Sequence, residues 1–206
     1  MTALQVRERL RLNLGTLSRT LMTGHVSTGS TPGKDEALAL ATKDDVRRTT
    51  EANAGTALDL VEELLVDAAA PLDLRVVTEE INAIFGCGVL KPGLLYRKND
   101  PASGFPYLPA AAILEYAAFF YRMGGQSTAG DVDVAAWAIW AIDLRGHLFA
   151  DGCGKTATLV SGLILARAGL TIPLYTSRDA YYAAPYAMSG AMSWRAWRAY
   201  FISITG

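Results

Sequence analysis

Residues 146–156 read Gly-His-Leu-Phe-Ala-Asp-Gly-Cys-Gly-Lys-Thr and join two strongly apolar stretches, residues 132–144 and 156–168. Each apolar stretch is long enough for a helix, so we expect a buried helix on either side of the link. Two buried helices joined by a polar, glycine-rich connection predict a helix–loop–helix core. We expect chemistry in the connection, because functional residues concentrate in loops that a rigid scaffold positions.

The residue types in this link suit phosphate chemistry. Gly152 and Gly154 let the backbone approach an anion closely, at the start of a helix where free N–H groups and the helix dipole favour negative charge. Lys155 adds a positive charge in the first helical turn, which is unfavourable unless an anion is bound. Asp151 offers a hard oxygen ligand for a Mg²⁺ that also holds phosphate. His147, four residues before Asp151, can take a proton from a hydroxyl.

The link also has features of two other kinds of functional site. Gly154-Lys155-Thr156 is typical of a phosphate-binding P-loop, but that pattern requires a glycine where this chain has Phe149. The segment before the link is also predicted as helix rather than strand, which excludes a P-loop. Cys153 beside Lys155 suggests instead a thiolate with His147 as its base, so a cysteine-dependent hydrolase or transferase stays an alternative.

The rest of the chain is predicted to be mainly α-helical. Apolar residues recur at helical spacing over residues 3–22, 44–66, 78–85, 109–123 and 193–204. Residues 90–108 break this pattern with glycines and prolines among aromatic residues, which predicts a β-hairpin or an extended flap. We expect one compact unit in which residues 1–70 form an N-terminal helical extension and residues 71–206 form the core.

The composition restricts the class of protein. Its 206 residues are 51% hydrophobic and 19% charged with a net charge of −1, which argues against disorder and against general nucleic-acid binding. Two cysteines and two histidines are too few for a disulfide framework or a zinc site. No apolar stretch approaches the roughly 20 residues of a membrane span, and the dispersed charges of the first twenty residues do not fit a signal peptide. We therefore expect a cytoplasmic protein with no nucleic-acid or membrane partner; the sequence indicates no oligomeric state.

The link resembles the motif of the Fic family, His-x-Phe-x-Asp/Glu-Gly-Asn-Gly-Arg-x-x-Arg. The matching positions, in register and without a gap, are His147, Phe149, Asp151, Gly152 and Gly154. The resemblance implies a Fic-like helical fold in which residues 90–108 form a short β-hairpin flap over the active site. It also implies that residues 71–206 are the Fic-like core.

The resemblance further implies an activity, since Fic proteins transfer part of a nucleotide, most often AMP from ATP, to a hydroxyl on a target. It makes His147 the catalytic base and Asp151 the ligand of a Mg²⁺ on the phosphates. The residues that would bind ATP or another nucleoside triphosphate are Gly152, Cys153, Gly154, Lys155 and Thr156. The hydroxyl-bearing target, a protein or a small molecule, would lie under the flap 90–108.

Three positions depart from the family motif. Cys153 stands in place of the asparagine, Lys155 in place of the first arginine and Thr158 in place of the second. These changes remove an amide and weaken the grip on the distal phosphates. Doc, a relative that phosphorylates its target, also lacks the second arginine, so a Doc-like phosphotransferase acting on a hydroxyl is an alternative. A catalytically degenerate protein that binds a nucleotide or a partner is another.

Overall fold

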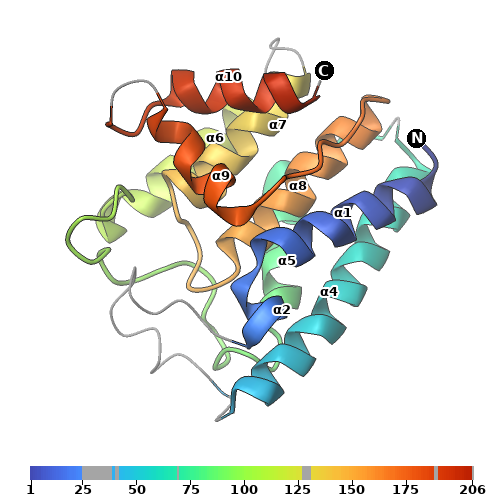
Figure 1. Ribbon diagram of the computed structural model, residues 1–206. Helices are drawn as coiled ribbons and strands as arrows, with labels where there is room; N and C mark the ends of the chain where they lie inside the picture. Colours follow the sequence, from blue (N-terminus) through green and yellow to red (C-terminus); the bar gives the residue numbers. More distant parts are fainter. Residues whose placement is uncertain (25–38, 40–41, 69, 127–130, 188–189, 206) are drawn as a thin grey trace.

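The structure is a computed structural model that describes residues 1–24, 39, 42–68, 70–126, 131–187 and 190–205 (Figure 1). Within these ranges the chain is helical and contains no β-sheet, which confirms the prediction of a mainly α fold. The elements are α1 (Ala3–Leu17), α2 (Arg19–Thr23), α4 (Lys43–Val66), α5 (Leu74–Gly86), η1 (Ala110–Ala112), α6 (Ile113–Gln126), α7 (Asp131–Ile139), η2 (Trp140–Leu144), α8 (Cys153–Arg167), α9 (Arg178–Ala183), η3 (Ala184–Tyr186) and α10 (Trp194–Thr205). None of the described helices has the length and apolarity needed to cross a bilayer.

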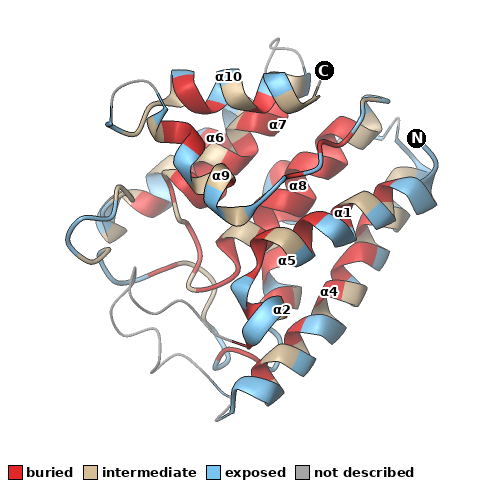
Figure 2. Ribbon diagram, viewed as in Figure 1, coloured by how far each residue is buried: buried red, intermediate tan, exposed pale blue. Residues whose placement is uncertain are grey.

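Helix α8 lies at the centre of the molecule, with α1, α5 and α7 packed around it (Figure 1). Residues 155–165 of α8 are buried on every side, as the red colouring of Figure 2 shows. A helix that is apolar on all of its faces is typical of a fully buried position, which explains the uninterrupted apolar stretch in the sequence. Gly162 lets α1 approach closely, since a Cβ there would lie 2.3 Å from the Leu10 side chain.

The N-terminal helices share the hydrophobic core of the rest of the chain. Helices α1 and α4 pack against α8, and Leu14 of α1 and Leu58 of α4 belong to the same buried cluster as Leu163 of α8. The single helix expected over residues 3–22 is divided at Ser18, whose backbone is extended (ψ 106°) and whose hydroxyl accepts from the Leu21 amide. The division ends α1 and starts α2 in a new direction.

Helix α7 continues into one turn of π-helix, η2, before the motif loop, which we define as residues 146–152. In this turn the Arg145 amide donates to the Trp140 carbonyl at 2.8 Å, five residues back. Only glycine fits directly after the turn, because a Cβ on Gly146 would lie 1.8 Å from the Ala141 carbonyl oxygen. Single π-turns inside α-helices are frequent at functional sites. This one brings Asp143 beside the motif loop.

Residues 90–108 do not form the β-hairpin expected from the sequence. The segment follows the motif loop instead, and a β-bridge pairs Tyr96 with Phe149. The Arg97 amide donates to the Leu148 carbonyl at 2.9 Å, and the buried Arg97 guanidinium donates to the His147 carbonyl at 3.0 Å. The segment forms no hairpin because residues 95–97 pair with the motif loop, while within the segment the Phe105 amide donates to the Ala102 carbonyl in a local turn.

Candidate active site

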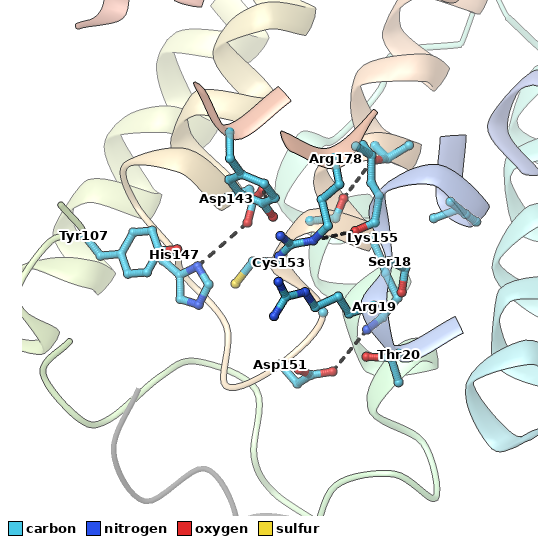
Figure 3. Close-up of a pocket in the computed structure, with 16 residues that line it drawn as sticks. Ser18, Arg19, Thr20, Tyr107, Asp143, His147, Asp151, Cys153, Lys155 and Arg178 are labelled. Atoms are coloured by element: carbon cyan, nitrogen blue, oxygen red, sulfur yellow. Dashed lines mark hydrogen bonds and ion pairs between the residues drawn. The ribbon is translucent and has the colours of Figure 1, made fainter. Parts of the chain in front are cut away.

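A pocket at the N-terminal end of α8 brings the predicted site residues together (Figure 3). The motif loop and the first turn of α8 form one side, and the junction of α1 with α2 and the start of α9 form the other. His147, Asp151 and residues 152–155 all line this pocket. The described structure therefore gathers the predicted base, the predicted metal ligand and most of the predicted nucleotide contacts in one cavity.

His147 is held firmly at one end of the pocket. Its backbone lies in the left-handed region with φ 45°, which a residue other than glycine keeps only when its surroundings enforce it. The imidazole stacks on the Tyr107 ring, with 4.0 Å between the ring centroids and 11° between the planes. Nδ1 is the ring nitrogen that faces Asp143, at 3.8 Å from Oδ1. The ring is thus fixed by a flat aromatic contact and a carboxylate.

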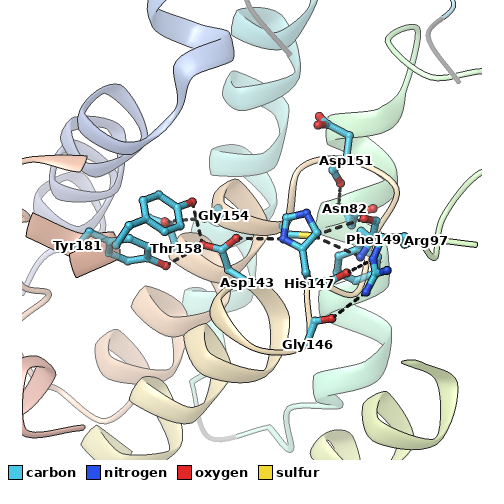
Figure 4. Close-up of polar contacts among 12 residues, drawn as sticks. Asn82, Arg97, Asp143, Gly146, His147, Phe149, Asp151, Gly154, Thr158 and Tyr181 are labelled. Atoms are coloured by element: carbon cyan, nitrogen blue, oxygen red, sulfur yellow. Dashed lines mark hydrogen bonds and ion pairs between the residues drawn. The ribbon is translucent and has the colours of Figure 1, made fainter. Parts of the chain in front are cut away.

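Asp143 is a buried carboxylate, 1% exposed, that links His147 to two tyrosines (Figure 4). Its Oδ2 accepts hydrogen bonds from the hydroxyls of Tyr181 and Tyr182, each at 3.1 Å, while Oδ1 faces the imidazole. Burial raises the pKa of Asp143 to about 6, and the two tyrosine hydrogen bonds oppose that rise. Asp143 is not among the site residues predicted from the sequence; a carboxylate four residues before the motif histidine was the available signal.

The motif loop is held in shape by side chains on both sides. The Phe149 amide donates to Cys153 Sγ at 3.3 Å, so the thiol supports the loop from the first turn of α8. From α5, Asn82 Nδ2 donates to the Asp151 carbonyl at 2.8 Å and to Thr156 Oγ1 at 3.1 Å. Gly152 has φ 80°, a backbone conformation that other residues rarely adopt, and a Cβ there would crowd Asn82 Nδ2 at 3.1 Å. Cys153 therefore serves the loop as a buried structural contact.

The start of α8 is arranged for an anion. No side chain caps this helix, no acidic residue lies in its first turn, and Gly152 occupies the N-cap position. The N–H groups of residues 153–155 have no intrahelical acceptor at such a terminus, and they carry the positive end of the helix dipole. Lys155 Nζ lies 3.2 Å from Asp151 Oδ2 and 5.6 Å above the Phe85 ring. The lysine charge is thus shared with Asp151 at the rim of the anion site.

Thr156 and Thr158 occupy different places. Thr156, predicted to contact the nucleotide, is fully buried away from the pocket wall. Its hydroxyl accepts from Asn82 and its amide donates to the Gly152 carbonyl at 2.8 Å, so its polar groups support the helix start rather than the cavity. Thr158 does line the pocket, and its hydroxyl donates to the Gly154 carbonyl at 2.7 Å.

The surroundings of Asp151 fit a magnesium ion that the nucleotide itself would largely hold. Asp151 is a carboxylate on the pocket wall, 8% exposed. The described residues contain no group of three or more His, Cys, Asp or Glu side chains that could hold a metal ion alone. Magnesium in nucleotide sites commonly takes one or two carboxylates, with phosphate oxygens and water completing the shell. A single carboxylate beside an anion site meets that requirement.

Two arginines that line the pocket are not among the site residues predicted from the sequence. Arg19 at the start of α2 and Arg178 at the start of α9 both line the cavity. No motif surrounds either residue, and their elements lie far from the motif loop in the sequence, so only the fold reveals them. Arg97 of the segment 90–108 does not join them, because its guanidinium is buried against backbone carbonyls.

Comparisons with known proteins place the fold. A Fic domain containing signaling protein from Bacteroides thetaiotaomicron superimposes with a TM-score of 0.65 at 14% identity, over 98% of this chain and 86% of that one. A Fic family protein from Desulfovibrio desulfuricans gives 0.60 at 16% identity, over 98% of this chain and 63% of that one. This chain has the Fic fold. IbpAFic2, in a complex with adenylylated Cdc42, also shares the Fic fold, with a TM-score of 0.55 at 16% identity over 98% of this chain and 68% of that one. No family model and no curated protein matches the sequence.

Proposed function

We propose that this protein is a Fic-family transferase that moves a nucleotidyl group of the AMP type from a magnesium-bound nucleoside triphosphate to a hydroxyl of a target. The observation that carries the proposal is the pocket that His147, Asp151 and the uncapped start of α8 share within a Fic fold. A base, a magnesium ligand and an anion site are the three parts that such a transfer needs.

His147 acts as the general base. The Asp143 carboxylate near Nδ1 favours a proton on that nitrogen, so Nε2 carries the lone pair that accepts the proton of the target hydroxyl. The hydroxyl oxygen then forms a bond to the α-phosphorus, and the bond from that phosphorus to the oxygen bridging the α- and β-phosphates breaks. Diphosphate leaves with the electron pair of the broken bond. The stacked Tyr107 ring keeps the imidazole in place during the transfer.

The start of α8 stabilises the charge of the phosphates. The N–H groups of residues 153–155 donate to phosphate oxygens, and Lys155 adds a positive charge beside them. Asp151 would hold the magnesium ion, which supplies charge neutralisation on the phosphates when it is bound. Lys155 then shifts its interaction from Asp151 toward the phosphates, a change that a flexible lysine side chain allows.

The target hydroxyl reaches His147 beside Tyr107, at the end of the segment 90–108. This segment borders the motif loop through the Tyr96–Phe149 bridge, so an acceptor bound against it would lie next to the base. The structural neighbour IbpAFic2 is in a complex with an adenylylated protein, Cdc42, which supports a protein as the acceptor.

The test follows the radioactive label of the nucleotide. The wild-type protein is incubated with magnesium, a cell extract as acceptor, and ATP or another nucleoside triphosphate labelled at either the α- or the γ-phosphate. We expect acceptor labelling from the α position only, lost by at least ~10²-fold in His147→Ala and on removal of magnesium by a chelator. Labelling from the γ position alone would identify a phosphotransferase. No labelling with any nucleotide, while the nucleotide still binds, would indicate a degenerate binding protein.

A further inference from the structure

Three cationic side chains from three different elements meet on one side of the pocket. Lys155 comes from α8, Arg19 from the first position of α2, and Arg178 from the first position of α9. Figure 3 shows them together, across the pocket from His147 and Tyr107. The pocket therefore has a direction, with the base at one end and positive charge at the other.

Neither arginine forms an ion pair with the acidic residues that line the described pocket, although Arg178 is near enough to Asp143 to lower the pKa of that carboxyl electrostatically. Asp151 pairs with Lys155 at 3.2 Å, and Asp143 accepts from two tyrosine hydroxyls and faces His147. Among the residues that the structure describes, neither Arg19 nor Arg178 lies within ion-pair distance of a carboxylate. The positive charges in one cavity repel one another, and a bound anion offsets this repulsion because it attracts each of them.

The fold holds Arg178 in place by specific contacts and brings Arg19 to the same pocket through the chain bend at Ser18. Arg178 Nε donates to the Leu17 carbonyl at 3.2 Å, and its guanidinium lies 4.4 Å from the Tyr182 ring centroid. Arg19 follows directly after Ser18, where the chain bends out of α1. The same bend leaves the Leu17 carbonyl outside the helix and places Arg19 at the pocket. Arg178 thereby connects α9 to the end of α1 at the pocket.

Between the arginines and the start of α8, the pocket is lined by a short side chain and borders a second hollow. Thr158 lines it with a short side chain whose hydroxyl is turned to the Gly154 carbonyl. Arg19 and Arg178 also border a second, more open hollow of about 720 Å³ that adjoins the pocket. A ligand that enters from this hollow meets the two guanidinium groups before it reaches the N–H groups of α8.

We propose that Arg19 and Arg178 form the subsite for the β- and γ-phosphates of the nucleoside triphosphate, supplying from α2 and α9 the charge that the motif itself lacks at Thr158. This inference rests on the proposed function. The α-phosphate lies at the start of α8 beside His147, and the chain of phosphates extends toward the α1–α2 junction. Guanidinium groups suit this task because they bind phosphate oxygens through two parallel hydrogen bonds.

Calorimetric titration with AMP, ADP and ATP, each with magnesium, tests the subsite. The variants are Arg19→Gln, Arg178→Gln and the double variant, with Arg11→Gln as the matched control, since Arg11 is exposed on α1 and pairs with Glu8. We expect the ATP affinity of the double variant to fall by at least ~10-fold and its ADP affinity to fall by less. Its AMP affinity should stay within about twofold of the wild-type value. Arg178→Lys retains charge and is expected to keep more of the preference for ATP over AMP than Arg178→Gln.

The outcomes separate this inference from the proposed function. A wild-type protein that binds none of the three nucleotides contradicts both the proposed function and the proposed subsite. A wild type that binds ATP, with variants whose affinities for ATP and AMP fall by equal factors or do not change, overturns the subsite alone. A purely structural role of the arginines would produce that equal loss, because it does not depend on the number of phosphates.

Discussion

The tautomer of His147 decides whether the proposed base can accept a proton. The Asp143 carboxylate, 3.8 Å from Nδ1, favours the tautomer with the proton on Nδ1. The substitution Asp143→Asn would remove that negative charge while keeping the size of the side chain. We expect Asp143→Asn to lower kcat of nucleotidyl transfer by ~10²-fold and to change nucleotide affinity by no more than about twofold. Steady-state transfer with α-labelled nucleotide measures the first effect and calorimetry the second. A variant with the wild-type kcat would remove Asp143 from the mechanism.

The same carboxylate predicts a pH dependence of stability. Burial raises the pKa of Asp143 from 3.8 to about 6, so the folded protein binds this proton more tightly than the unfolded chain does. The contribution of Asp143 to the free energy of unfolding therefore falls as the pH rises from about 4 to about 6, and it stays low above that range. Asp143→Asn removes this loss.

We expect the free energy of unfolding of Asp143→Asn, relative to the wild type, to increase by about 2 kcal/mol between pH 4 and pH 7. Denaturant titrations of both proteins across this range measure the difference. A difference that does not change with pH would mean that Asp143 titrates at an ordinary carboxyl pKa.

At the scale of residues, the sequence predicted the part of the site that lies within one short stretch. His147, Asp151 and Gly152 were predicted from their residue types and from the resemblance to the Fic motif, and they share a pocket because a loop and the first turn of a helix bring residues a few positions apart to one place. Arg19 and Arg178 could not be found this way, because only the packing of α1 and α9 near the start of α8 brings them to the pocket. Thr156 was predicted as a nucleotide contact from the motif, but the turn of the helix carries its side chain toward Asn82.

At the scale of elements, the motif loop depends on its contact with α5. Asn82→Ala would leave the buried Asp151 carbonyl without its donor, which we expect to lower the free energy of unfolding by about 1–3 kcal/mol and to weaken nucleotide binding. Denaturant titration and calorimetry measure the two effects. Asn53→Ala is the matched control, because Asn53 donates to the Cys87 carbonyl just after the C-terminal end of α5, not to the motif loop, and should change stability alone. Equal effects of both variants on nucleotide binding would contradict a specific role for Asn82.

The segment 90–108 shows where local sequence patterns fail for a whole element. Its glycines, prolines and aromatic residues are typical of a hairpin, in which a segment pairs with itself. Here the pairing partner of Tyr96 is Phe149, and the Arg97 guanidinium reaches the His147 carbonyl fifty positions along the chain. A contact of that sequence separation leaves no periodic signal in the segment, so its extended course was predictable but its partner was not.

At the scale of the whole molecule, α1 and α8 interlock at one point of the core. Leu10 fills the space over Gly162, and a Cβ at Gly162 would lie 2.3 Å from the Leu10 side chain. We expect Leu10→Ala to cost ~2–5 kcal/mol and Gly162→Ala ~1–3 kcal/mol in the free energy of unfolding. The double variant should cost at least ~1 kcal/mol less than the two together, because the new methyl group occupies part of the vacated space. Additive costs in denaturant titrations would show that the two helices do not meet at this point.

The helical class and the central pair of helices were predictable because α7 and α8 are apolar over most of their length, which only a buried position explains. The packing of α1 on α8 was not, since an amphipathic helix shows which of its faces is buried but not against what. That packing matters for function, because the bend after α1 carries Arg19 to the pocket.

The central claim is that the start of α8 holds the phosphates of a nucleotide beside His147. Nuclear magnetic resonance of the labelled wild-type protein, titrated with magnesium and a non-hydrolysable ATP analogue, tests it directly. The account predicts that the amide signals of Cys153, Gly154 and Lys155 and the ring signals of His147 shift together and saturate with a single Kd. Shifts confined to other parts of the chain, or no shifts at all, would contradict it.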